Sequence, residues 1–186
     1  LEGTGAMVLD HIGRVAYAAR SNRTNEVALE RFCTHFNFEP MVFDALDSSG
    51  KPIYHTNVLM CIGTDYALVG TDMITDPARR QEIVDRLQET GRTVIHLTAE
   101  QIGEFAGNAI ELEGRDGRVL ALSARAFAAL SRAQIETIEQ TAKLLPFAVP
   151  TIELAGGSVR CMLAGIHLSR RTTNGTHLLY ATTRAG

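Results

Sequence analysis

The chain has 186 residues, is 45% hydrophobic and carries a formal net charge of −3, so it can bury a core, and its length suits a single domain, 1–186, better than two. It contains no run of Lys or Arg, which argues against a nucleic-acid binder. Its apolar runs are well short of the roughly 20 residues that a transmembrane helix needs, and no signal-peptide pattern opens it. We therefore expect a cytoplasmic protein that engages neither nucleic acid nor a membrane.

The first predicted unit, residues 1–47, has the order strand, strand, helix, strand. Its elements are strands at 6–10 and 14–19, a helix capped by Asn25 or Thr24, and a strand at 40–46. Apolar residues at helical spacing give this helix one buried face, made of Leu29, Phe32, Cys33 and Phe36.

The same order recurs in residues 54–98 and 105–155. The second unit is predicted to hold strands at 57–63 and 66–70, a helix opened by Asp76 and Pro77, and a strand at 93–98. The third is predicted to hold strands at 108–114 and 118–124, a helix with the capping box Ser131-x-x-Gln134, and a strand at 149–155. A short extra helix, with the capping box Thr98-x-x-Gln101, precedes the third unit.

The repeat predicts how the units pack. Asn57 and Asn108 mark the same place in successive units, 51 residues apart, and a partial fourth unit is predicted at 157–186, with strands at 159–168 and 176–182. Each helix has one apolar face and the strands look buried, so no unit can bury its own core and neighbours must pack side by side. The start without Met, inside the lead-in to a strand, suggests that more chain lies upstream.

Three chemically distinct residues fall at or just before the first strand of their units: Glu2, His55 and Cys161. If the repeat brings these strands toward one axis, a carboxylate, an imidazole and a thiol become neighbours. That set suits covalent catalysis by a thiolate, with a histidine to move protons and an acid to bind a cationic or NH-rich group.

Each of these residues could instead have a purely structural role. A lone cysteine in an apolar element is usually a small core residue, and we interpret Cys33 and Cys61 in this way. Cys161 differs because it follows the flexible sequence Gly-Gly-Ser at 156–158. His55 could instead cap a loop, and Glu2 could be a solvated terminal residue. The three cysteines are odd in number and far apart, so neither a disulfide framework nor a metal site is predicted.

The stretches LEGTGAMVLD, YHTNVLMCIG and GGSVRCMLAGI, beginning at residues 1, 54 and 156, resemble in order and spacing the guanidine-modifying enzymes of the pentein superfamily. This group holds arginine deiminases, amidinotransferases and dimethylarginine hydrolases, and the likeness is strongest to its arginine-deiminase-related, citrulline-utilisation branch. The resemblance covers the whole chain. It implies an α/β propeller of five ββαβ modules, of which this chain would carry about three and a half.

The resemblance also implies roles for particular residues. Cys161 falls on the nucleophile that attacks a guanidino or ureido carbon, and His55 on the group that protonates the leaving amine and then activates water. Glu2 falls on the acid that holds the substrate's NH groups. The chain departs from the family at Asn57 and Gly5, where deiminases usually carry Asp. Because an amide offers both a donor and an acceptor, Asn57 would suit a neutral, citrulline-like substrate.

The resulting hypothesis is a cofactor-free, metal-free hydrolase that acts on a small amino acid through a covalent cysteine intermediate. Arginine-type deimination, an amidinotransferase and a non-catalytic binding module remain open alternatives, and so does a homo-oligomer. The acidic substrate ligand that the family keeps in its first modules lies outside this sequence, so we expect the chain by itself to be inactive. Asn108 and Arg20 are interpreted as structural rather than as channel-lining residues.

Overall fold

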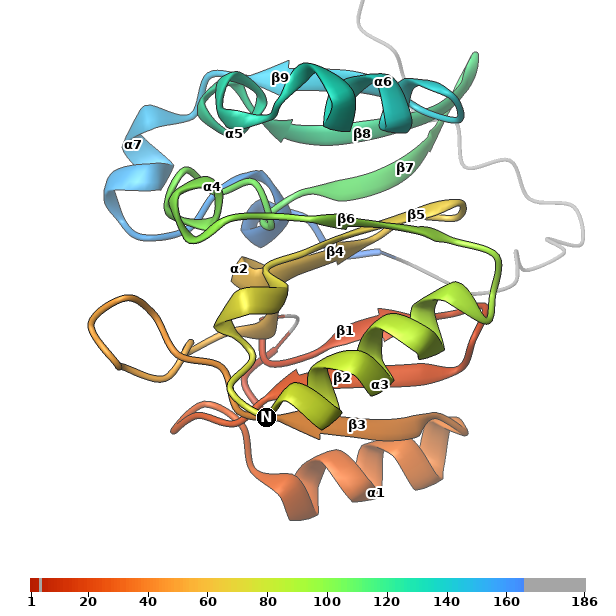
Figure 1. The fold of residues 1–186 in the computed structure, drawn as a ribbon, viewed down its shortest axis with the longest axis vertical. Helices are drawn as coiled ribbons and strands as arrows, with labels where there is room; N and C mark the ends of the chain where they lie inside the picture. Colours follow the sequence, from red (N-terminus) through yellow and green to blue (C-terminus); the bar gives the residue numbers. More distant parts are fainter. Residues whose placement is uncertain (4, 166–186) are drawn as a thin grey trace, which may run out of the picture.

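The structure is a computed structural model that describes residues 1–3 and 5–165. The described chain forms three three-stranded sheets, each built from a consecutive stretch of sequence. Figure 1 shows the sheets following one another in chain order along the long axis of the molecule. Each sheet pairs its first two strands antiparallel and adds the third parallel to the second. The predicted α/β class with repeated ββαβ units is confirmed.

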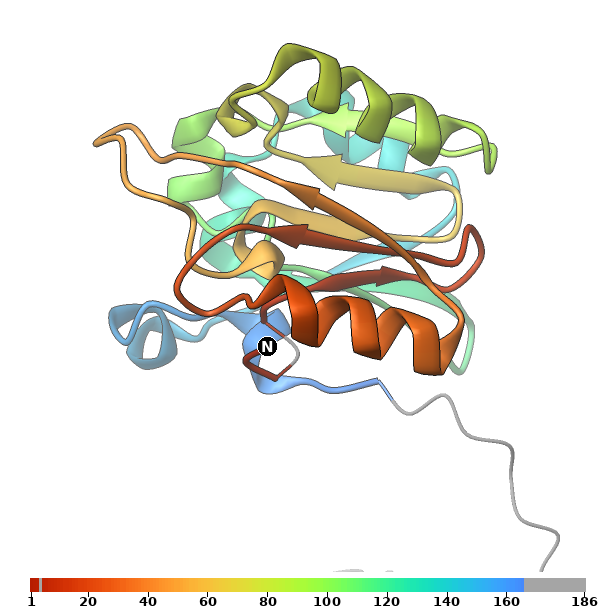
Figure 2. The ribbon, with the colours of Figure 1, turned by 90° about the horizontal axis from the view of Figure 1, so that it is seen from below.

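The first unit contains β1 (Val8–Asp10), β2 (Val15–Ala19), α1 (Glu26–Phe36) and β3 (Glu39–Phe43). Asn25 is the N-cap of α1, and its Oδ1 accepts a hydrogen bond from the backbone N–H of Ala28. Leu29 and Cys33 are buried beneath the helix, whereas Phe36, near its end, is half exposed. Figure 2 shows α1 on the outer side of the first sheet. The helix therefore covers the sheet with Leu29, Phe32 and Cys33 of the predicted apolar face, while the prediction that Phe36 is buried is wrong.

The second unit contains α2 (Thr56–Leu59), β4 (Met60–Ile62), β5 (Tyr66–Val69), the 3-10 turn η1 (Thr71–Met73), α3 (Pro77–Gln88) and β6 (Thr93–His96). Asp76 caps α3 by accepting from the N–H of Ala78, and Pro77 occupies the first helical position, where no N–H is needed. Ile83 and Leu87 are fully buried. The predicted start of this helix is confirmed, and Ile83 and Leu87 form its inner face.

The third unit contains β7 (Ile110–Gly114), β8 (Gly117–Ser123), α5 (Ala124–Ala129), α6 (Arg132–Glu139) and β9 (Lys143–Phe147), and the extra helix α4 (Ala99–Gly103) precedes it. Both predicted capping boxes form: Thr98 with Gln101 at α4, and Ser131 with Gln134 at α6. In each, the hydroxyl accepts from the third helical N–H and the Gln side chain accepts from the capping residue's N–H.

The strand predicted at 57–63 is wrong in its first half. Residues Thr56–Leu59 form the single helical turn α2, and only Met60–Ile62 pair with β5. A short apolar run can be a strand or a buried helical turn, and periodicity does not separate the two. The helical turn matters because it places His55 and Asn57 at its beginning.

The strand predicted at 149–155 is also wrong. Residues Pro150–Leu154 form the helix α7, and β8 instead takes Lys143–Phe147 as its parallel partner. Pro150 has no N–H to donate to a sheet but fits the first turn of a helix. Pro150 therefore indicates the helix at this position, whereas the apolar run suggested a strand.

The strand predicted at 159–168 is not formed where the structure describes it, because Val159–Met162 form the 3-10 turn η2. The predicted strand at 176–182 lies outside the described residues, as does most of the predicted partial unit 157–186. The limits proposed for the units stay predictions.

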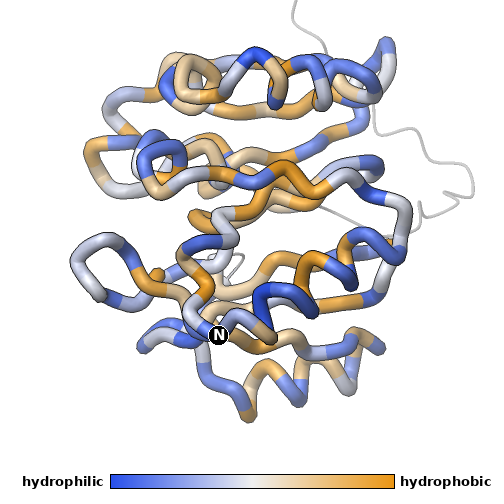
Figure 3. Tube along the Cα trace, in the orientation of Figure 1, coloured by the Kyte–Doolittle hydropathy of each residue, from blue (hydrophilic) through white to orange (hydrophobic). Residues whose placement is uncertain are grey.

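The first strands of successive units lie side by side, with β4 in contact with both β1 and β7. One hydrophobic cluster runs through all three units, and its members include Tyr17, Tyr66, Leu68, Leu120 and Ile138. Figure 3 shows hydrophobic segments along the strands and hydrophilic stretches along the helices. The core is therefore shared between units, as the repeat predicts. Among the helices described, none combines the length and the apolar character needed to cross a membrane.

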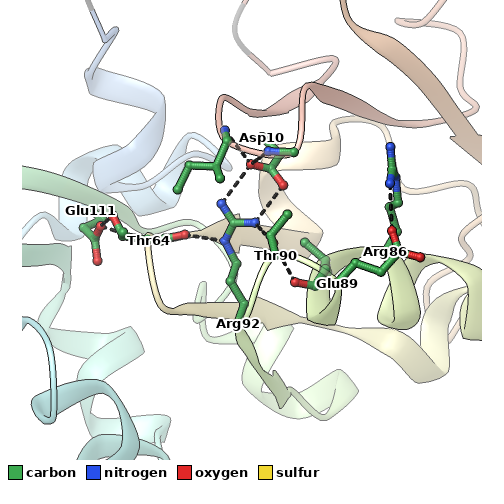
Figure 4. A network of polar contacts seen from close by, with 11 residues as sticks. Asp10, Thr64, Arg86, Glu89, Thr90, Arg92 and Glu111 are labelled. Carbon is green, nitrogen blue, oxygen red and sulfur yellow. Dashed lines mark hydrogen bonds and ion pairs between the residues drawn. The ribbon is translucent and has the colours of Figure 1, made fainter.

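A buried ion pair joins the first two units. Arg92 donates from Nη1 and Nη2 to the two carboxylate oxygens of Asp10, at 2.7 and 2.8 Å, and from Nε to the carbonyl of Gly63 at 2.7 Å. The backbone N–H groups of Ile12 and Gly13 also donate to Asp10. Figure 4 shows the guanidinium facing the carboxylate. Because both side chains are almost fully buried, this pair holds the end of β1 against the lead-in to β6.

Candidate active site

His55 stands immediately before α2 and is held by a carboxylate from the beginning of the chain. Its backbone is extended, and its Nε2 lies 2.6 Å from Oε2 of Glu2. The His55 side chain is 20% exposed and that of Glu2 is 46% exposed. Two of the residues singled out in the sequence, 53 positions apart, are therefore direct partners at the surface.

Glu2 is held from two sides. Its Oε1 accepts from Nη1 of Arg23 at 2.5 Å while its Oε2 meets His55. The hydrogen bonds with His55 and then with Arg23 lower the pKa of the Glu2 carboxyl, so it is ionised at neutral pH. Because both oxygens are already engaged, the carboxylate holds the imidazole in a fixed orientation. Binding of substrate by Glu2 stays a prediction.

Gly5 leaves room for the His55 ring. A Cβ built at this buried glycine would lie 2.7 Å from Nδ1 of His55 and 2.8 Å from Cγ, closer than real contacts allow. The Gly5 carbonyl also accepts from the N–H of Asn57 at 3.2 Å. A side chain at this position would therefore displace the imidazole.

If His55 moves protons in a reaction, as the sequence predicts, replacing Gly5 by alanine lowers kcat about 100-fold, because a shift of about 1 Å in a reacting group can cost that much. Steady-state kinetics of the complete protein check this result. Gly103→Ala is the matched control, because its Cβ would meet nothing within 4 Å, and it should leave kcat unchanged. Equal kcat values for the two variants would show that the His55 ring moves without consequence.

Cys161 lies in η2 and is the exposed member of the three cysteines. A Cβ at Gly157 would come within 3.5 Å of its Sγ, so the glycine allows the preceding loop to pass close to the sulfur. Burial raises the pKa of the Cys33 thiol, and burial raises that of the Cys61 thiol to about 12. Those two cysteines stay protonated within the core, as their interpretation as core residues predicts.

Asn57 and Asn108 both lie against Cys161. Nδ2 of Asn57 is 3.6 Å from Sγ, and Nδ2 of Asn108 is 3.2 Å from it. The interpretation of Asn108 as purely structural therefore missed its contact with the thiol. The signal that could have found it is the repeat, since Asn108 stands where Asn57 stands in the preceding unit. Arg20, by contrast, forms exposed ion pairs with acidic side chains of its own unit.

Tyr54 is a further residue of the site that the sequence analysis did not single out. Its hydroxyl donates to the carbonyl of Gly156 at 2.7 Å, and its ring centroid lies 4.9 Å from that of His55. Gly156 has a φ of +87°, a left-handed conformation that favours glycine. Tyr54 thus ties the segment carrying His55 to the loop that leads to Cys161. Burial, and then the nearby Cys161, raise the pKa of its phenol, so it remains a neutral donor.

The structure therefore brings the four predicted site residues together as two pairs, Glu2 with His55 and Asn57 with Cys161, joined by the three-residue segment 55–57. Within residues 1–3 and 5–165, no cluster of three or more His, Cys, Asp or Glu side chains could hold a metal ion. A groove of about 570 Å³ borders β1, β4 and β7 and has Arg160 in its lining, but none of the four predicted site residues lines it. Its volume is in the range of small-molecule sites.

Units of ββαβ order, with inner strands side by side and a thiol, an imidazole and a carboxylate near their beginnings, define the pentein class of guanidine-modifying proteins. Comparison with known families agrees, because residues 1–168 match the family described as N,N dimethylarginine dimethylhydrolase, eukaryotic. The chain belongs to this family. Comparison with curated proteins finds no match.

Several solved structures are similar to the described fold. ArgZ, an arginine dihydrolase from the ornithine-ammonia cycle in cyanobacteria, is 19% identical with a TM-score of 0.69, over 87% of this chain and 24% of its own. The N-terminal domain of ArgZ bound to product is 20% identical with a TM-score of 0.67, over 87% and 55%. SxtG, an amidinotransferase from Microseira wollei in the saxitoxin biosynthetic pathway, is 12% identical with a TM-score of 0.57, over 84% and 42%.

These identities are low, so the likeness to solved structures shows a shared fold. The chain spans about a quarter of ArgZ and about half of its N-terminal domain. The pentein fold is thus common to this chain, to an arginine dihydrolase and to an amidinotransferase.

Proposed function

We propose that the protein is a hydrolase that acts on the guanidino or ureido carbon of an arginine-like or citrulline-like amino acid through a covalent bond to Cys161. One observation carries the proposal: the exposed thiol of Cys161 lies beside Asn57. Asn57 follows His55 by two residues in the sequence, and His55 is hydrogen-bonded to Glu2. A cysteine that only fills space in the core would be buried, whereas the thiol of Cys161 is exposed and contacts a polar side chain. The fold shared with amino-acid-modifying enzymes supports the same assignment.

In the proposed reaction, the thiolate of Cys161 adds to the substrate carbon and forms a carbon–sulfur bond. The carbon–nitrogen bond to the departing amine breaks, and His55 supplies the proton that this amine needs. Water then adds to the carbon of the S-linked intermediate and gives a proton back to His55. The carbon–sulfur bond breaks, which restores the thiolate. Splitting one difficult displacement into two easier steps is the gain of nucleophilic catalysis.

Glu2 serves this cycle through His55. Its carboxylate is ionised at neutral pH because its pKa is lowered, and its hydrogen bond with Nε2 orients the ring that supplies the proton. Asn57 is buried next to the sulfur and offers an amide where family members usually carry a carboxylate. These roles for Glu2, His55, Asn57 and Cys161 are part of the proposal.

We propose a substrate with a guanidino group as the first candidate and a substrate with a ureido group as the second. The family description names dimethylarginine and the similar ArgZ acts on arginine, both of which carry a guanidino group. The amide of Asn57 is the observation that keeps a neutral, citrulline-like substrate in view, because an amide imposes no charge on its neighbours. An amidinotransferase, as SxtG is, would share the first half of the cycle and pass the group to an amine instead of water.

Mass spectrometry of the complete protein, quenched during turnover, tests the proposal. With arginine or dimethylarginine we expect one covalent adduct on Cys161 and a product in which water has replaced an amine. An adduct with citrulline would move the assignment to ureido hydrolysis. An adduct that persists until an acceptor amine is added would indicate the transferase. If no substrate of this class forms an adduct, the protein is a binding module and the proposal is wrong.

A further inference from the structure

The sulfur of Cys161 is contacted by side-chain amides from two successive units. Asn57 comes from the second unit and Asn108 from the lead-in to the third, and their side-chain nitrogens lie 3.6 and 3.2 Å from Sγ. Both asparagines are 1% exposed. Because the two positions are equivalent in the repeat, the packing of neighbouring units directs one amide from each toward the same atom.

The orientation of the Asn108 amide follows from its second partner. The same Nδ2 donates to the backbone carbonyl of Asn57 at 2.9 Å. A carbonyl oxygen can only accept, so the group facing it must be the nitrogen. The nitrogen that meets the sulfur is therefore a donor, and the sulfur of Cys161 is its acceptor.

The backbone of Asn108 supports the same arrangement. Its carbonyl accepts from the N–H of Arg160 at 3.3 Å, which is the residue before Cys161. Asn108 thus contacts the second unit through the Asn57 carbonyl, the 3-10 turn η2 through Arg160, and the thiol itself. It holds the sulfur in a fixed place relative to α2, where His55 and Asn57 lie.

Both amides also carry an unfavourable feature. The Oδ1 atoms of Asn57 and Asn108 are buried and have no hydrogen-bond partner within the part of the chain that the structure describes. Burying an amide oxygen without a partner is destabilising. An apolar side chain of similar size at position 57 would fill the same space without that cost, so stability by itself does not explain the amide of Asn57, whereas the Asn108 amide also donates to the Asn57 carbonyl.

We propose that Asn108 is a positioning residue which, together with Asn57, donates hydrogen bonds to the sulfur of Cys161 and stabilises its thiolate. The inference rests on the proposed function, in which this thiolate is the nucleophile. Hydrogen bonds to the charged form of a group favour that form, and the thiolate is the form that attacks carbon. Among the described residues, Tyr54 interacts electrostatically with the thiol, and the guanidinium of Arg160, the residue before Cys161, donates to the carbonyl of Leu163.

Alkylation by iodoacetamide tests this role without any substrate. In the complete protein, Asn108→Ala is expected to slow alkylation of Cys161 at pH 7 about tenfold, as the loss of one hydrogen bond to a charged group implies. At a pH high enough to ionise the thiol fully, the two rates should converge. Peptide mass spectrometry assigns the label, and the buried Cys33 and Cys61 should stay unlabelled.

Asn57→Ala is the second variant. Its longer contact predicts a smaller effect, about threefold at pH 7, and the Asn57 side chain makes no other hydrogen bond to the described residues, so the variant should fold. Ser131→Ala is the control: it removes the cap of α6, destabilises the fold modestly, and should leave alkylation unchanged.

Unchanged alkylation of folded Asn108→Ala at pH 7, or an equal loss at every pH, would overturn the inference. If that variant does not fold, Asn57→Ala decides alone, and an unchanged rate overturns the proposal. The outcome is independent of turnover. If the substrates form no adduct while the alkylation rates still depend on the two amides, the proposed function fails and the donor pair stands. If adducts form and the alkylation rates do not depend on the amides, the proposed function stands and the donor pair fails.

Discussion

Replacing Cys161 by alanine is expected to lower kcat/KM by a factor on the order of 10⁴ or more and to abolish the covalent adduct. The reason is that Cys161 is the attacking thiolate of the proposed reaction, and removal of a nucleophile typically costs this much or more. The other two cysteines are buried with raised pKa values, so neither can substitute. Steady-state kinetics and intact-mass measurement of the complete protein check both outcomes.

Cys33→Ala is the matched control for this prediction. It removes a thiol of the same kind from the small cluster beneath α1, which also includes Leu29. We expect a modest loss of stability and the same kcat/KM as in the unchanged protein. If Cys161→Ala retained turnover, or if both variants lost it equally, the assignment of Cys161 as nucleophile would be wrong.

Replacing Arg92 by leucine is expected to lower the free energy of unfolding by about 3–5 kcal/mol, the usual effect of removing one partner from a buried ion pair. The carboxylate of Asp10 would remain buried with only the N–H groups of Ile12 and Gly13 to stabilise its charge. The carbonyl of Gly63 would also lose its donor. Urea unfolding of the complete protein, followed by circular dichroism, measures the change.

Arg132→Leu provides the comparison, because Arg132 pairs with Glu136 along α6 while its side chain is 92% exposed. Such surface pairs contribute about 0.3–0.5 kcal/mol, so this variant should unfold almost as the unchanged protein does. The double change of Asp10 and Arg92 to leucine should cost less than Arg92→Leu, since it leaves no buried charge. Similar small losses for Arg92→Leu and Arg132→Leu would show that the buried pair does not hold the first two units together.

The helices α1, α3, α4 and α6 could be predicted from the sequence because their signals are local. Asp76 followed by Pro77 marks the start of α3, and Ser131 with Gln134 marks that of α6. A capping side chain bonds to an N–H two or three residues away, so the sequence contains both partners. The starts of these two helices were therefore placed correctly.

Two short apolar runs could not be assigned in the same way. The runs at 57–63 and 149–155 are compatible with a strand or with a helical turn, and the choice depends on which segment pairs with the neighbouring strand. β5 pairs with Met60–Ile62, and β8 pairs with Lys143–Phe147. Strand pairing joins residues far apart in the chain, so the local pattern does not determine it.

By itself the sequence determined the repeat of ββαβ units, the chemical types gathered near their first strands, and the particular residues Glu2, His55 and Cys161. Side-chain chemistry and spacing are properties of the chain itself. Only the tertiary structure decided that Glu2 meets His55, that Gly5 leaves room for the imidazole, and that Asn108 donates to the sulfur. Those relations join separate units, so they depend on the distances and directions that the packing of one unit against the next creates.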